Sequence, residues 1–90
     1  MGRGGEPVRL VDALHALGLE GDIAQQGRWI TLQGERGHVF VIEADWGAGY
    51  AAWCDTPGQR TVEWYDDPTQ AILAGLRRAA VPPPLRHVPP

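Results

Sequence analysis

The stretch His38-Val39-Phe40-Val41-Ile42-Glu43-Ala44 gives the strongest strand signal in this 90-residue chain. Its four consecutive apolar residues, 39–42, leave no polar face, which is typical of a central strand that is covered on both sides. The cover can be provided by other elements on both faces, or by a helix on one face and aromatic side chains on the other. Residues 38–44 are therefore expected to form the middle of a β-sheet.

Glycine-punctuated segments on both sides of this stretch predict further strands in an antiparallel meander. Gln26-Gly27 fits a tight hairpin, residues 34–37 fit a turn, and residues 45–49 fit a loop. Thr56-Pro57-Gly58-Gln59 predicts a type II turn, because Pro-Gly suits its two central positions. The expected strands are residues 22–25, 28–33, 38–44, 50–55 and 60–65.

An amphipathic helix is expected on each side of the strands in sequence. The first begins near Pro7 and runs for about 11 residues, with Leu10, Leu14 and Leu17 on one face. Gly18 followed by Leu19 predicts its end as a Schellman motif.

The second helix has a clear start, with Asp67 as N-cap, Pro68 at N1 and Gln70 at N3. Gln70, Arg77 and Arg78 are expected to point outward. The apolar face is expected to contain Ile72, Leu73, Leu76, Ala79 and Ala80.

These elements predict an α+β fold: a two-layer sandwich of an N-terminal helix, a four- to five-stranded antiparallel meander and a C-terminal helix. Residues 7–81 are expected to form a single domain, preceded by a flexible arm at residues 1–6. Residues 82–90 contain five prolines and predict a disordered tail. The sheet face opposite the helices is expected to be solvated or used for dimerisation.

Charge and cysteine content narrow the classes of function. All eight basic residues are arginine and the formal net charge is −3, which disfavours a surface that must neutralise phosphates. Cys54 is the only cysteine, so an intramolecular disulfide is excluded. The first ten residues lack an apolar signal-peptide core, and no stretch is long and apolar enough to span a membrane. We therefore expect a cytoplasmic protein without membrane contact.

Catalytic and metal-binding patterns are weak in this sequence. His15, His38 and His87 have no partner at ligand spacing, and the chain has no phosphate-loop motif, so neither a metal nor a cofactor is expected. A small enzyme is conceivable only if folding brings Cys54 and His38 together as nucleophile and base, with Glu43 nearby.

The four tryptophans are the most distinctive feature of the composition. Trp53 and Trp64 are expected to fill the core, and Trp29 to lie on the other sheet face, because Ile30 and Leu32 define the buried one. Exposed tryptophan and tyrosine side chains often dominate protein contacts. The candidate partner-binding residues are Trp29, Trp46 in its glycine-flanked loop, Tyr50 and Tyr65.

The chain combines three features: only arginine among its basic residues, a glycine-punctuated meander, and the segment Trp64-Tyr65-Asp66-Asp67-Pro68, which leads into an Ala/Leu/Arg helix. In this the chain resembles small uncharacterised accessory proteins of high-GC bacteria, their phages and plasmids. That resemblance implies a role in binding and modulating a partner protein.

The element order also resembles a double-stranded RNA-binding domain, although Asp66-Asp67-Pro68 replaces the basic helix start of that family. The sequence thus favours a non-enzymatic, protein-binding accessory or regulatory module that can form a homodimer. Nucleic-acid binding is the alternative, and a Cys54/His38 enzyme is the third.

Overall fold

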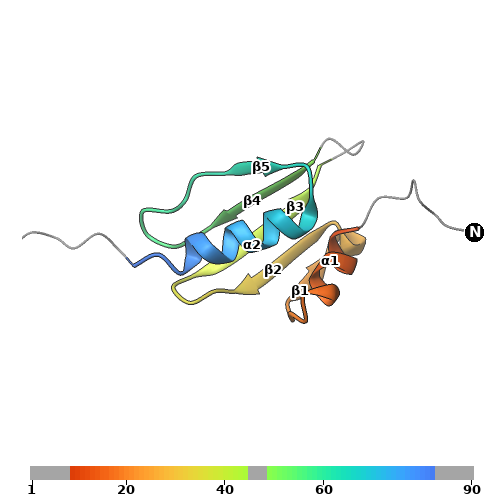
Figure 1. Ribbon diagram of the computed structural model, residues 1–90, viewed down its shortest axis with the longest axis horizontal. Helices are drawn as coiled ribbons and strands as arrows, with labels where there is room; N and C mark the ends of the chain where they lie inside the picture. The colour runs from red at the N-terminus through yellow and green to blue at the C-terminus, as the bar shows by residue number, and fades with distance from the viewer. Residues whose placement is uncertain (1–8, 45–48, 83–90) are drawn as a thin grey trace, which may run out of the picture.

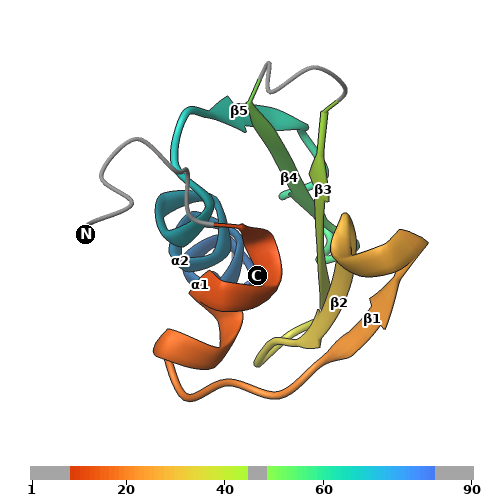
Figure 2. The same ribbon diagram turned by 90° about the vertical axis from the view of Figure 1, so that its right-hand side faces the viewer.

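A five-stranded antiparallel sheet forms one layer of the molecule, and two helices on one of its faces form the other (Figures 1 and 2). The structure is a computed structural model that describes residues 9–44 and 49–82. The predicted arm at residues 1–6, Trp46 and residues 83–90 of the predicted tail lie outside these ranges. The elements are α1 (Leu10–Ala16), β1 (Asp22–Ala24), the 3-10 turn η1 (Gln25–Gly27), β2 (Trp29–Gln33), β3 (His38–Glu43), β4 (Tyr50–Cys54), β5 (Glu63–Tyr65) and α2 (Pro68–Ala79).

The sheet is a meander in which β3 is the central strand, as its apolar run predicts. Its order is β1-β2-β3-β4-β5, with every neighbouring pair antiparallel. Val41 lies between Ile30 of β2 and Ala52 of β4, and all three are buried on the helix side. The predicted α+β fold with a meander and two flanking helices is confirmed.

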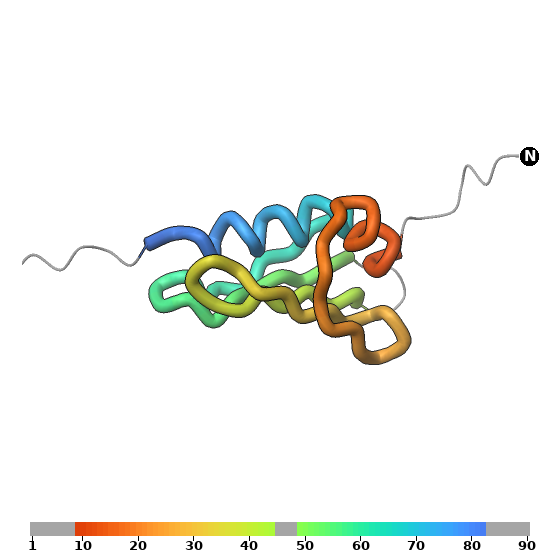
Figure 3. Tube along the Cα trace, turned by 90° about the horizontal axis from the view of Figure 1, so that it is seen from below, coloured from red at the N-terminus to blue at the C-terminus, as the bar shows by residue number. Residues whose placement is uncertain are grey.

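Helix α2 lies very close to the sheet because small residues form the contact. A Cβ atom placed on Gly75 would come within 2.5 Å of Val39 Cγ1. The core between the layers is consequently thin, and Figure 3 shows both helices against the same side of the sheet. The buried apolar cluster consists of Leu10, Ala13, Leu14, Ile30, Leu32, Val39, Val41, Tyr50, Ala52, Cys54, Ala71, Ile72 and Ala79.

Local sequence signals at the helix ends and at one turn are confirmed. Gly18 has φ 71°, and the N–H of Leu19 donates to the carbonyl oxygen of Leu14, which completes the Schellman motif. The Asp67 carboxylate accepts from the N–H of Gln70 at 2.9 Å and caps α2. Gly58 has φ 82°, and the N–H of Gln59 donates to the carbonyl oxygen of Thr56, as a type II turn requires.

Several boundaries differ from the prediction. Helix α1 begins at Leu10, later than expected, and β5 covers only Glu63–Tyr65, because residues 60–62 do not pair with β4. The predicted two-residue hairpin is instead η1, in which Gln25, Gln26 and Gly27 all have positive φ. Leu73 was expected on the apolar face of α2, but its side chain is 43% exposed.

Within the described ranges, neither helix has the length and apolarity needed to cross a membrane.

Candidate interaction surface

The sheet face turned away from both helices carries an apolar surface that is rich in aromatic side chains. Strand register places Trp29, Ile42, Ala51 and Trp64 in one row across β2 to β5. The next row contains Asp22, Thr31, Phe40 and Trp53 across β1 to β4. Since alternate residues of a strand share a face, these two rows lie on the same side of the sheet. We call the surface formed by Trp29, Phe40, Ile42, Trp53 and Trp64 the aromatic face.

The rings at the centre of the aromatic face pack against one another. Trp53 stacks on Phe40 with ring centroids 5.6 Å apart and an interplanar angle of 23°. Trp29 meets Trp53 edge to face, with centroids 5.6 Å apart and an angle of 85°. Both arrangements are favourable for aromatic pairs, so the three rings stabilise one another and are held in fixed orientations.

Trp64 extends this cluster towards the edge of the sheet. Its side chain is 62% exposed, whereas Trp29, Phe40, Ile42 and Trp53 are partly buried. Val62, two residues before Trp64, is exposed as well. A large indole exposed beside a preformed cluster of rings is typical of a contact surface.

The prediction that Trp53 and Trp64 belong to the core is wrong. On β4, Ala52 and Cys54 take the helix side, and alternation turns Trp53 to the other face. The close approach of Gly75 to Val39 leaves little height between the layers, so small residues occupy the part of the core where indole rings were expected. The prediction that Trp29 lies on the face opposite Ile30 and Leu32 is confirmed by the burial of those two residues.

The two tyrosines predicted as partner-binding residues lie on the helix side of the sheet. Tyr50 is only 8% exposed and belongs to the core, and this burial raises the pKa of its phenol. Tyr65 lies opposite Tyr50 and packs against the core cluster. Its hydroxyl donates to Glu63 Oε1 at 2.7 Å, and this hydrogen bond raises the pKa of Tyr65. Neither tyrosine is part of the aromatic face.

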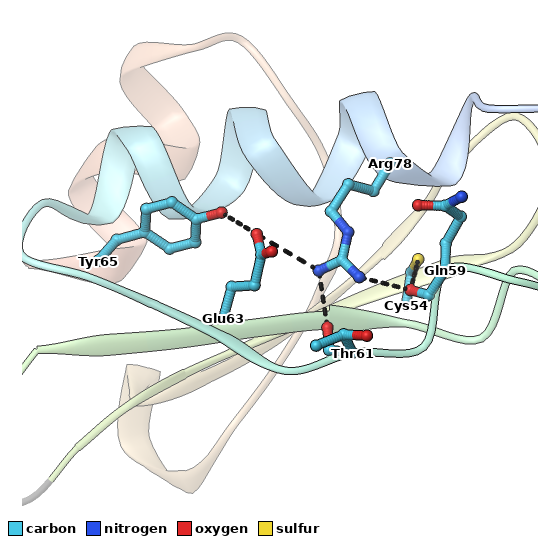
Figure 4. A network of polar contacts seen from close by, with 6 residues as sticks. All are labelled: Cys54, Gln59, Thr61, Glu63, Tyr65 and Arg78. Carbon is cyan, nitrogen blue, oxygen red and sulfur yellow. Dashed lines mark hydrogen bonds and ion pairs between the residues drawn. The ribbon is translucent and has the colours of Figure 1, made fainter.

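A polar network links α2 to the segment that carries Trp64 (Figure 4). Arg78 was expected to point outward, but its side chain is 16% exposed and lies along the sheet edge. Its guanidinium donates to the carbonyl oxygens of Thr61 at 2.7 Å and Gln59 at 3.0 Å, and it lies 3.6 Å from Glu63 Oε1. Arg78 therefore fastens residues 59–63 to the helix and positions β5, with Trp64 on the opposite face.

One end of the aromatic face is polar. There Gln33, His38 and Asp55 form the next row of the sheet, beyond Phe40 and Trp53. The N–H of His38 donates to Asp55 Oδ1 at 2.6 Å, and His38 Nδ1 lies 3.3 Å from Asp55 Oδ2. The backbone hydrogen bond is the main reason that the pKa of Asp55 is lowered.

Two clefts border the aromatic face. The larger, of about 340 Å³, is lined by Glu20, Gly21, Asp22, Thr31, Leu32, Gln33 and His38. The smaller, of about 220 Å³, is lined by Gln25, Arg28, Trp29, Ile42 and Glu43.

Across residues 9–44 and 49–82, no group of three or more His, Cys, Asp or Glu side chains is placed to hold a metal ion.

The residues of the enzyme alternative are not brought together. Cys54 is buried on the helix side, where its thiol donates to the carbonyl oxygen of Gln59 at 3.1 Å. His38 lies on the opposite face and contacts Asp55. Glu43 occupies the other end of β3, about 17 Å from His38 at the rise of an extended strand.

Sequence reasoning identified Trp29 but assigned Trp53 and Trp64 to the wrong face, and it did not single out Phe40 or Ile42 as surface residues. Alternation along β4 separates Trp53 from Ala52 and Cys54, but it does not say which of the two sets faces the helices. Comparisons with protein-family models, curated proteins and solved structures found no match for this chain.

Proposed function

We propose that this protein is a non-enzymatic protein-binding module and that the aromatic face is its contact surface. The observation that carries the proposal is the preformed cluster of Trp29, Phe40 and Trp53 with the exposed Trp64 beside it. Tryptophan contributes strongly to protein contacts, because one large and rigid side chain buries much apolar area at little cost in conformational entropy.

The chemistry of the surface favours a protein over a nucleic acid as its partner. Aromatic rings can stack on bases, but single-stranded nucleic acids also require a positively charged track for the phosphates. None of the five residues of the aromatic face is charged, and its polar end carries the carboxylate of Asp55. The net charge of −3 acts in the same direction.

Affinity capture with three baits tests the proposal. The baits are the wild-type chain, Trp64→Glu on the aromatic face and Leu73→Glu on α2. Leu73→Glu is a matched control, because it introduces the same charge at another exposed apolar residue, on the helix layer. We expect the capture to yield a protein that, once purified, binds the wild-type chain and Leu73→Glu directly. The same protein should bind Trp64→Glu at least about tenfold more weakly.

Two results would count against this function. One is binding that Leu73→Glu abolishes and Trp64→Glu leaves intact. The other is tight, salt-sensitive binding to DNA or RNA in a mobility-shift assay, which would favour the nucleic-acid alternative.

A further inference from the structure

We infer that the partner of the aromatic face is a second copy of this chain, packed face to face to give four layers in the order helix, sheet, sheet, helix. The inference rests on the proposed function, since it assigns a partner to the same surface. Figure 2 shows that both helices lie on one side of the sheet, which leaves the other side as the face for a second sheet.

The shape of the surface suits the packing of two sheets. Sheets that stack face to face lie about 10 Å apart, with side chains from the two inner faces interdigitating. Phe40 and Ile42 lie on β3, the central strand, and Trp29 and Trp53 lie on the strands beside it. A two-fold axis through the middle of this face would therefore set the apolar rows of one copy against those of the other.

The area of the surface is near the lower limit for a specific dimer. The strands lie about 4.8 Å apart, and each residue adds about 3.4 Å along a strand. Over the length of the two rows, the five strands therefore cover roughly 350 Å² of flat area. The relief of the indole and phenyl rings adds to this area, so two faces together bury about 1,000 Å², near the low end for specific interfaces. We expect association in the micromolar range, with folded monomers at low concentration.

Charge also favours a second copy as the occupant. Two chains of net charge −3 repel each other, so they can approach most easily through a surface without charged groups. On β2 to β5 the two rows, which contain Trp29, Thr31, Phe40, Ile42, Trp53 and Trp64, lack ionisable groups, so pairing them there buries no charge. Asp22 extends the second row on the edge strand β1, where it is exposed and can remain in solvent. Salt screens the repulsion between the two copies, and raising its concentration should strengthen the dimer.

Sedimentation equilibrium of the wild-type chain, from about 1 μM to about 500 μM, measures this association directly. We expect a reversible monomer–dimer equilibrium whose Kd falls when salt is raised from about 50 mM to about 500 mM. Trp64→Glu should raise the Kd at least about tenfold, because it places a carboxylate in the interface. Leu73→Glu should leave the Kd within about twofold of the wild-type value.

The salt dependence of the wild-type Kd is a test that does not depend on whether a variant folds. A wild-type chain that stays monomeric at the highest concentration overturns the inference, as does a dimer that Leu73→Glu breaks and Trp64→Glu does not. If the chain is monomeric but still binds another protein through Trp64, the claim that the partner is a second copy is refuted, and the proposed function is not. A monomer whose capture of proteins is insensitive to Trp64→Glu would refute both.

Discussion

The indole of Trp53 stacks on the phenyl ring of Phe40, with centroids 5.6 Å apart, on the sheet face turned away from both helices. The two residues are directly opposite each other on β4 and β3, so backbone pairing itself sets the contact. Trp29 closes the cluster from β2. The sheet thus has a second, smaller apolar layer of its own, and this layer has both a structural role and a surface available for contact.

Replacement of Trp53 by alanine should destabilise the isolated chain. The mutation removes the stack on Phe40 and the edge contact with Trp29, at a cost of about 2 kcal/mol for a partly buried ring. Trp64→Ala is the matched control and should cost no more than about 0.5 kcal/mol, because Trp64 is largely exposed. Urea denaturation at low protein concentration measures both values without a contribution from association. Equal costs would contradict the structural role of the cluster.

Gly75→Ala should lower stability even though alanine is the better helix former. The added Cβ would lie 2.5 Å from Val39 Cγ1, and such overpacking costs about 1–3 kcal/mol against a gain of about 1 kcal/mol in helix propensity. In a double-mutant cycle, Val39→Ala should relieve part of the cost, so the double variant should be more stable than the sum of the single effects implies. A variant Gly75→Ala that is more stable than wild type would disprove the close approach of helix and sheet.

Arg78→Ala should loosen β5, because it removes the donors to the carbonyl oxygens of Gln59 and Thr61. The loss is about 1–2 kcal/mol, to which the half-exposed partner Glu63 contributes little. Arg77→Ala is the control, because Arg77 is exposed on the same helix turn and should cost less than about 0.5 kcal/mol. Hydrogen exchange should show faster exchange at residues 59–65 in Arg78→Ala only. Unchanged exchange there would show that the network does not hold β5.

The contact between His38 and Asp55 predicts a specific contribution to acid sensitivity. The backbone N–H of His38 stabilises the ionised carboxylate and lowers the pKa of Asp55 below its ordinary value. This stabilisation is therefore present above the unfolded-state pKa and is lost as pH falls through the lowered folded-state pKa. Between about pH 5 and about pH 2, Tm should fall less steeply for Asp55→Asn than for wild type. The control Glu35→Gln, at an exposed turn residue, should retain the wild-type slope, and an identical slope for Asp55→Asn would contradict the prediction.

The parts of the fold that depend on short-range chemistry could be predicted from the sequence. Gly18 ends α1, Pro57-Gly58 forms the type II turn, and Asp67 caps α2, because each needs only its immediate neighbours in the chain. The apolar run of β3 likewise located the central strand, and its second interpretation holds, with helix on one face and aromatic rings on the other.

The side of the sheet on which each aromatic residue lies could not be predicted in this way. On β4, Tyr50, Ala52 and Cys54 alternate with Ala51 and Trp53, and either set is apolar enough to form the core. The choice depends on how closely α2 approaches, which is set by the contact between Gly75 and Val39 across the layers. In the structure this close contact between the layers accompanies a buried Tyr50 and an outward Trp53.

Hydroxyl-radical footprinting of Trp64 and Leu73 is the most direct test of the claim that the aromatic face is the binding surface. Both side chains are exposed and lie on opposite layers, so a single experiment reads both faces. On complex formation, with a second copy or with another protein, the oxidation rate of Trp64 should fall several-fold while that of Leu73 stays unchanged. Protection of Leu73 with an unchanged rate at Trp64 would place the contact on the helices and contradict the account.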